Sequence, residues 1–154
     1  MTKYKHTQIG YLMLVVTLFV IALFVWLYVT ASAETPSVDS GTNFLITAIM
    51  TLTIFILVSF VTLTTSIDEN NIKIKFGYGI FTKKFALTDI VSAQAVKNHW
   101  CYGWGIRFWF WPKMWIYNVS GFDAVEIVMK NGKIYRIGTN DPKRLETLIK
   151  NNGK

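Results

Sequence analysis

The sequence predicts two transmembrane α-helices in an antiparallel hairpin, followed by a mainly-β barrel or curved sheet that a C-terminal helix closes. Three observations support this fold class. Two long uncharged stretches occupy most of the first 65 residues. Short segments of alternating polarity follow from Ser66, as is typical of strands. An amphipathic segment near the end of the chain predicts a helix over residues 142–151.

The charges divide the chain in the same way. Residues 7–66 carry only Glu34 and Asp39, whereas residues 67–154 carry 14 lysines and arginines and 7 acidic residues. Hydrophobic residues make up 52% of the chain, which is unusual for a soluble domain of this length. We therefore expect an N-terminal transmembrane hairpin over residues 1–66 and a basic cytosolic β domain over residues 67–154.

The first apolar span covers about residues 9–33. It holds no charged residue and is long enough to cross a hydrocarbon layer of roughly 30 Å as a helix. The alternative is a signal peptide cleaved after Ala33, which Lys3, Lys5 and the small residues before Glu34 favour. The apolar run is longer than the roughly 7–15 residues of a signal core, so we expect a retained anchor.

The second apolar span covers about residues 44–65 and follows a short polar connector over residues 34–43. Because the connector is short, the two helices must be antiparallel. Five hydroxyl residues fall close to one helical face: Thr47, Thr51, Ser59, Thr62 and Thr65. Such residues let helices approach and hydrogen-bond across the contact. Neither span holds an Asp, Glu, Lys, Arg or His residue, and intramembrane charge is the usual mark of ion or proton transport.

Basic residues flank the spans asymmetrically. Lys3 and Lys5 precede the first span, Lys73 and Lys75 follow the second, and the connector has none. The positive-inside rule therefore places both termini in the cytoplasm. Cys101 is the single cysteine, which excludes a disulfide within the chain and fits a reducing compartment.

The β domain is expected to contain many short strands. The candidate strands are residues 63–67, 72–76, 80–87, 90–96, 106–110 and 114–119, and a hairpin over 124–137. Asn131-Gly132 predicts a two-residue type I′ turn in that hairpin. This register puts Val125, Ile127, Met129 and Ile134 on one face and leaves Arg136 as a misfit there. Asp141 and Pro142 suit the start of the last helix.

An aromatic segment, His99–Tyr117, holds five of the six tryptophans. Tryptophan suits sites such as the membrane interface, where one end of the ring is dry and the other wet. Strand alternation predicts one set of side chains in the core: Trp104, Ile106, Phe108 and Phe110. It predicts an outward set at the interface: Arg107, Trp109, Trp111 and Lys113. With Trp115, the outward set forms the candidate contact site for a membrane or a partner.

Several short motifs occur in a particular order along the chain. They are Tyr102-Gly-Trp-Gly-Ile-Arg107, Trp115-Ile-Tyr-Asn-Val-Ser-Gly121, Ala124-Val-Glu-Ile127, Asn131-Gly132-Lys133, and Ile137-Gly-Thr139 with Pro142 and Leu145. This order resembles small bacterial membrane proteins that carry two transmembrane helices and a pleckstrin-homology-like domain. The resemblance implies that fold and a multi-pass protein of the bacterial inner membrane. It implies no activity and carries over no catalytic residues.

No set of side chains in the sequence predicts catalysis. The two histidines, His6 and His99, lie far apart, and the acidic residues of the β domain show no paired spacing. No spacing indicates a metal-ligand cluster. We therefore expect neither an enzyme nor a bound cofactor or metal.

These patterns predict a membrane-anchored binding or scaffold module. Its expected partners are the lipid bilayer, anionic lipid headgroups, a membrane protein or a second copy of itself. The alternative is a small accessory subunit of a transport or secretion complex, docked through the hydroxyl-rich face of the second span. Basic and aromatic residues together can also stack nucleic-acid bases, but tethering to a membrane disfavours nucleic acid.

Overall fold

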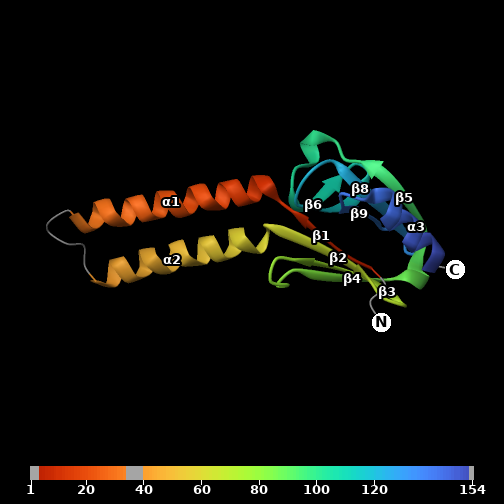
Figure 1. The fold of residues 1–154 in the computed structure, drawn as a ribbon, viewed down its shortest axis with the longest axis horizontal. Helices are drawn as coiled ribbons and strands as arrows, with labels where there is room; N and C mark the ends of the chain where they lie inside the picture. Colours follow the sequence, from red (N-terminus) through yellow and green to blue (C-terminus); the bar gives the residue numbers. More distant parts are fainter. Residues whose placement is uncertain (1–3, 34–39, 153–154) are drawn as a thin grey trace.

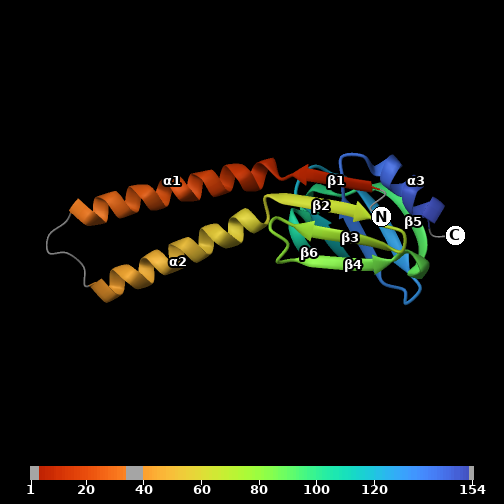
Figure 2. The same cartoon turned by 60° about the horizontal axis from the view of Figure 1, so that its bottom comes forward.

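Two long helices project from a β domain made of two sheets (Figure 1). The computed structural model describes residues 4–33 and 40–152. Helix α1 covers Tyr11–Ala33 and helix α2 covers Ser40–Ser59. The two helices run antiparallel and side by side in both ribbon views (Figures 1 and 2). Helix α2 begins four residues before the expected start at Phe44, and residues 34–39 of the expected connector lie outside the described residues.

The second apolar span does not continue as a helix to residue 65. Helix α2 ends at Ser59, and strand β2 covers Thr62–Ile67. The β-branched residues after Ser59 favour an extended backbone, and the amide of Gly77 donates to the carbonyl of Thr62. By length and composition, residues Tyr11–Ala31 can cross a membrane, whereas the apolar part of α2, Asn43–Ser59, is shorter.

The first sheet contains a strand that the sequence analysis missed. Strand β1, Tyr4–Ile9, pairs antiparallel with β2, with Tyr4 opposite Ile67 and Ile9 opposite Thr62. The sheet order is β1-β2-β3-β4, where β3 is Asn71–Phe76 and β4 is Thr82–Ala86. The first sheet therefore contains one strand that precedes α1 in the sequence and three that follow α2. The predicted domain boundary between residues 66 and 67 is wrong for this reason.

The second sheet has the order β5-β8-β9-β7-β6. Its strands are β5 Ile90–Lys97, β6 Gly105–Phe110, β7 Lys113–Asn118, β8 Asp123–Met129 and β9 Ile134–Gly138. Strands β7 and β9 pair in parallel, and the other neighbours are antiparallel. Short 3-10 turns precede β5 and β6, at Leu87–Asp89 and Trp100–Tyr102. All the strands predicted after residue 62 are present.

The core lies between the two sheets. It includes Leu63, Ile67, Ile72, Ile74, Phe76 and Phe85 from the first sheet, and Tyr117, Val125, Ile127 and Ile137 from the second. Helix α3, Pro142–Asn152, adds the buried Leu145 and Ile149. The amide of Arg144 donates to the Asp141 carboxylate, which confirms the predicted cap. Helix α3 lies beside β5, away from α1 and α2 (Figure 1).

The β8–β9 hairpin has a different register from the predicted one. Its loop contains three residues, because Met129 pairs with Lys133 through a backbone hydrogen bond and Val128 lies opposite Ile134. Gly132 has a φ of 76° there, which suits the left-handed residue of a three-residue hairpin loop. This one-residue shift moves Arg136 off the core face and places it opposite Glu126.

Candidate functional site

The β6–β7 hairpin, which carries most of the aromatic segment, lies on the side of the β domain nearest the helices. Strand β6 is an edge of the second sheet and stands near the helix ends in both ribbon views (Figures 1 and 2). The chain just after β7, at the open end of the hairpin, is close to the start of α1, because a Cβ on Gly10 would lie 2.9 Å from the Val119 carbonyl oxygen.

The predicted core set is only partly buried. Ile106 packs against the core, but Phe108 is 39% and Phe110 is 75% exposed. Both share the core-facing side of the sheet with Ile106, yet the opposing strand β4 is exposed over Thr82–Lys84. The prediction of burial was wrong for these two rings, because alternation gives the face of a strand and not the extent of the opposing sheet.

The exposed rings form a cluster on the edge of the second sheet. Phe108 packs edge-on against Phe110, with ring centroids 5.1 Å apart, and lies 5.2 Å from Trp115. Trp115 pairs directly with Phe108 across the hairpin, and Lys113 pairs with Phe110. These two candidate contact residues therefore share the face of the phenylalanines.

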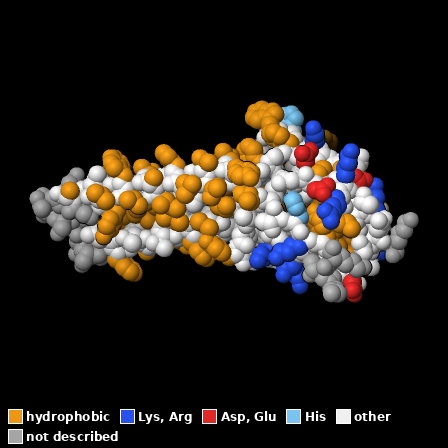
Figure 3. All heavy atoms as spheres, in the orientation of Figure 1, with side chains coloured by type: hydrophobic (Ala, Val, Ile, Leu, Met, Phe, Trp, Pro, Cys, Tyr) orange, Lys and Arg blue, Asp and Glu red, His pale blue; other side chains and the backbone are white. Residues whose placement is uncertain are grey.

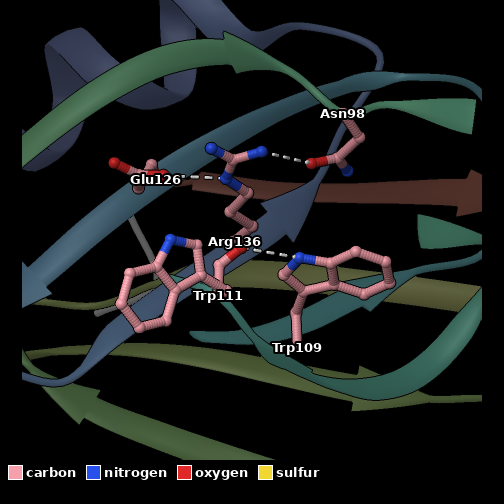
Figure 4. A network of polar contacts seen from close by, with 5 residues as sticks. All are labelled: Asn98, Trp109, Trp111, Glu126 and Arg136. Carbon is pink, nitrogen blue, oxygen red and sulfur yellow. Dashed lines mark hydrogen bonds and ion pairs between the residues drawn. The ribbon is translucent and has the colours of Figure 1, made fainter. Parts of the chain in front are cut away.

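Arg107 and Trp109 lie on the opposite face of the same strand. Trp109 is partly buried under Tyr102, with ring centroids 4.8 Å apart. Its indole N–H donates to the Trp111 carbonyl at 2.9 Å (Figure 4). Arg107 is exposed, and its Nε donates to the Trp104 carbonyl at 3.2 Å. The five predicted contact residues thus occupy two faces and the hairpin tip, where Trp111 is 89% exposed.

Arg136 occupies the centre of a polar network on the outer face of the second sheet (Figure 4). Its Nε lies 2.7 Å from Glu126 Oε2, and a terminal nitrogen donates to Asn98 Oδ1 at 3.4 Å. The guanidinium also lies over the Tyr102 ring, 5.5 Å from its centroid. These contacts, together with the Tyr102–Trp109 packing, hold the segment before β6 against the sheet.

A second apolar turn on the helix-facing side was missed by the sequence analysis. The turn between β3 and β4 exposes Tyr78, Ile80 and Phe81. Tyr78 stacks on Phe55 of α2 at 5.7 Å, and Phe81 stacks on Phe60 at 5.1 Å. A signal was present in the sequence, since this turn between two strands carries large apolar side chains where turns are ordinarily polar.

Lysines line the outer face of the first sheet. Lys73 and Lys75 on β3 alternate with buried residues, and Lys84 on β4 lies opposite Lys73. Lys5 on β1 lies opposite Ser66, which in turn lies opposite Lys73. In the space-filling view, hydrophobic side chains cover the helices, while charged side chains lie on the β domain (Figure 3).

His99 and Cys101 lie together in the turn before β6. The Nδ1 of His99 is 3.1 Å from the Cys101 sulfur and also accepts the Cys101 backbone N–H. The second bond caps the short 3-10 turn, so a local structural role accounts for this geometry. Among the described residues, no group of three or more His, Cys, Asp or Glu side chains could hold a metal ion.

Comparisons of the chain with protein-family models, with curated proteins and with solved structures gave no match.

Proposed function

We propose that this protein is a membrane-anchored binding or scaffold module with a pleckstrin-homology-like β domain. Helices α1 and α2 form a hairpin in a bacterial inner membrane, and both termini are cytoplasmic. The β domain contacts lipid headgroups or a membrane partner, and no catalysis is part of the proposal. One observation carries it: the β3–β4 turn exposes aromatic rings and stacks Tyr78 on α2, and strand β6, whose hairpin exposes further rings, stands near the helix ends (Figure 1).

The exposure of the helices supports insertion in a bilayer. Only 6% of the most apolar 18-residue stretch of α1 is buried within the molecule, whereas the core helix of a soluble protein is mostly buried. The 17 residues of Asn43–Ser59 would span about 25 Å as a helix. This is slightly shorter than a typical hydrocarbon layer of roughly 30 Å, a mismatch that local thinning accommodates at modest cost.

The chemistry of the two turns suits a bilayer interface. Aromatic rings concentrate at the level of the headgroups, and Tyr78 already stacks on Phe55 of α2. Lys113 lies beside the exposed rings of the hairpin, and Lys75 packs over Gly79 in the other turn. Each lysine near an anionic leaflet contributes on the order of 1 kcal/mol, so the tethered domain would be oriented by even a few of them.

Spin labels on the full-length protein test this proposal. In a Cys101→Ser background, single cysteines replace Trp111, Ile80 or Val91, and the labelled protein is placed in lipid nanodiscs. Val91 is exposed on β5, the opposite edge of the second sheet from β6, and is the control. Labels at 111 and 80 should be accessible to oxygen and shielded from a water-soluble nickel complex. The label at 91 should be accessible to the nickel complex and less accessible to oxygen. Equal exposure of all three labels to the nickel complex would refute the proposal.

A second candidate function is an accessory subunit that docks through α2. The hydroxyls of Thr47 and Thr51 donate to carbonyls four residues earlier in α2, rather than across the helix pair as predicted. Both residues line an exposed groove of about 500 Å³ with Phe44, Ala48, Leu52 and Phe55. Small residues on such a face allow close packing of another transmembrane helix.

Co-purification in mild detergent separates the two candidates. A stoichiometric larger membrane protein that is lost with Ala48→Trp, but retained with Ile46→Trp, would support the accessory subunit and contradict a stand-alone module. Ile46 is a suitable control because it is exposed on α2 and does not line the groove. No stoichiometric partner with the unaltered chain would contradict the accessory-subunit function.

A further inference from the structure

The two sheets leave an opening between strands β4 and β6. Each of these strands is an edge of its own sheet. A cavity of about 200 Å³ lies between them, with Phe76, Ile106 and Tyr117 among its lining residues and Ile80, Phe81 and Lys83 from the turn and the start of β4.

Apart from Thr82, Lys83 and the Tyr117 hydroxyl, the residues that line this cavity are apolar. Phe76 and Tyr117 are buried members of the core, and Ile106 packs against that core. No acidic residue is among the residues that line the cavity. Burial, with a smaller contribution from Tyr135, raises the pKa of the Tyr117 hydroxyl to about 12, so this group is neutral at physiological pH. A hydrocarbon chain fits such a lining, and a charged group does not.

Lys83 places one positive charge at the cavity. It lies opposite Ile74 in the sheet register, on the inner side of β4, whereas Lys84 lies opposite Lys73 on the outer side. Among the residues that the structure describes, no carboxylate pairs with Lys83. An inward lysine on an edge strand also discourages pairing with another strand. Its aliphatic stem can lie along apolar surface while the ammonium stays in water.

The cavity opens beside the helix pair. Ile80 and Phe81 line it, and they belong to the turn whose Tyr78 stacks on Phe55 of α2. If α2 is in a bilayer, the cavity lies next to the headgroup layer, where amphiphiles are concentrated. The inference rests on the proposed function in this respect.

We propose that the cavity binds the acyl chain of a single-chain anionic amphiphile, with its carboxylate or phosphate headgroup on Lys83. Ligand pockets for drug-sized molecules have volumes of roughly 300–1,000 Å³. The smaller cavity found here therefore accepts the end of one chain and excludes a lipid with two. A strand from another molecule is the less suitable occupant, because Lys83 and Lys84 hinder edge pairing and the lining offers rings rather than backbone groups.

Photo-crosslinking of the full-length protein in nanodiscs tests the proposal. The probes are a fatty acid with a diazirine at the end of its chain, and a single-chain phosphatidylglycerol with the same chain, which distinguish the two headgroup sources. Labelled peptides should contain residues of β3 or of the β6–β7 hairpin. Excess laurate should suppress the labelling, whereas dodecanol, which lacks the charge, should not.

Two variants and one matched control sharpen the experiment. Lys83→Gln should lower the labelling about fivefold, as expected for one lysine at an anionic headgroup, and Lys84→Gln should leave it unchanged. Ile106→Trp should abolish it by filling the cavity. Thermal unfolding of each variant shows whether the fold is intact. If Ile106→Trp unfolds the protein, Lys83→Gln still tests the proposal, because Lys83 is exposed and its substitution should leave the fold intact.

Three results would overturn the proposal. They are labels confined to α1 and α2, equal losses with Lys83→Gln and Lys84→Gln, and crosslinks between two copies through β4 or β6, which would indicate strand pairing. The spin label at position 111 separates this proposal from the proposed function. Lipid contact at 111 without a labelled cavity overturns only the amphiphile site, whereas a labelled cavity with 111 in water overturns the interfacial orientation.

Discussion

Arg136 is held on the outer face of the second sheet by Glu126, Asn98 and the Tyr102 ring. Its side chain is only 15% exposed and that of Glu126 is 23% exposed. A pair at this depth is screened less than a surface pair. Removing one member leaves the other poorly solvated, which costs more than the loss of a surface ion pair.

Glu126→Ala is therefore expected to lower the free energy of unfolding by about 1–3 kcal/mol, the range for a partly buried bond to a charged group. Urea unfolding in mild detergent, followed by tryptophan fluorescence, measures it. The matched control is Lys150→Ala, which removes the more exposed ion pair with Glu146 on α3 and should cost under about 0.5 kcal/mol. Equal effects of the two substitutions would show that the Arg136 network contributes no more than a surface pair.

Tyr117 predicts a change of stability at alkaline pH. Because its pKa is raised to about 12 in the folded protein, the unfolded chain loses this proton first. The neutral Tyr117 hydroxyl therefore makes its full contribution to the free energy of unfolding below about pH 10, and this contribution is lost as the pH rises toward 12. At 1.36 kcal/mol per pKa unit, the loss is at most about 2–3 kcal/mol. The difference in unfolding free energy between the wild type and Tyr117→Phe, measured from pH 8 to 12, should shrink or reverse over this window. Parallel profiles would contradict the buried, neutral hydroxyl.

At the scale of elements, two glycines determine how the helices join the first sheet. Gly77 has a φ of 43°, and a Cβ there would lie 2.5 Å from the Ser59 carbonyl oxygen at the end of α2. The amide of Gly10, before α1, donates to the Val61 carbonyl at 2.7 Å. Both helices therefore leave the sheet through close backbone contacts, without a flexible linker among these residues.

Gly77→Ala should destabilise the protein by about 2–4 kcal/mol, because left-handed backbone strain adds to a clash with rigid backbone. Gly132→Ala is the matched control, since Gly132 also has a positive φ but no atom near its Cβ position; it should cost about 1–2 kcal/mol from strain alone. Thermal unfolding of both variants in the same detergent gives the comparison. Equal losses would show that the contact with α2 is not tight.

At the scale of the whole molecule, the β domain depends on the N-terminal strand. Gln8 on β1 is buried, and its amide donates to the Ser120 carbonyl and to Asn140 Oδ1. Strand β1 thus connects the first sheet to loops of the second. In Figure 2, strands β1 to β4 run in roughly the same direction as the helices, so the first sheet extends the hairpin into the β domain.

A fragment of residues 67–154 should therefore fail to fold, because it lacks β1 and β2. A fusion that joins residues 1–9 to 62–154 through Asn-Gly should fold, since Ile9 and Thr62 are directly paired and a two-residue turn can connect such a pair. Circular dichroism and the dispersion of amide signals in NMR spectra distinguish the two. A folded 67–154 fragment would show that β1 is dispensable.

The sequence by itself determined the local elements and their types. Continuous apolarity specified the helical region, alternation specified the strands after residue 62, and Asp141 with Pro142 specified the start of α3, because each signal depends on residues within a few positions of one another. Only the tertiary structure decided what covers each face. The pairing of β1 with β2, the exposure of Phe108 and Phe110 and the position of Arg136 beside Glu126 depend on distant strands or on a one-residue choice of register. Residues that are neighbours along the chain specify neither the contacts with distant strands nor the register of the hairpin.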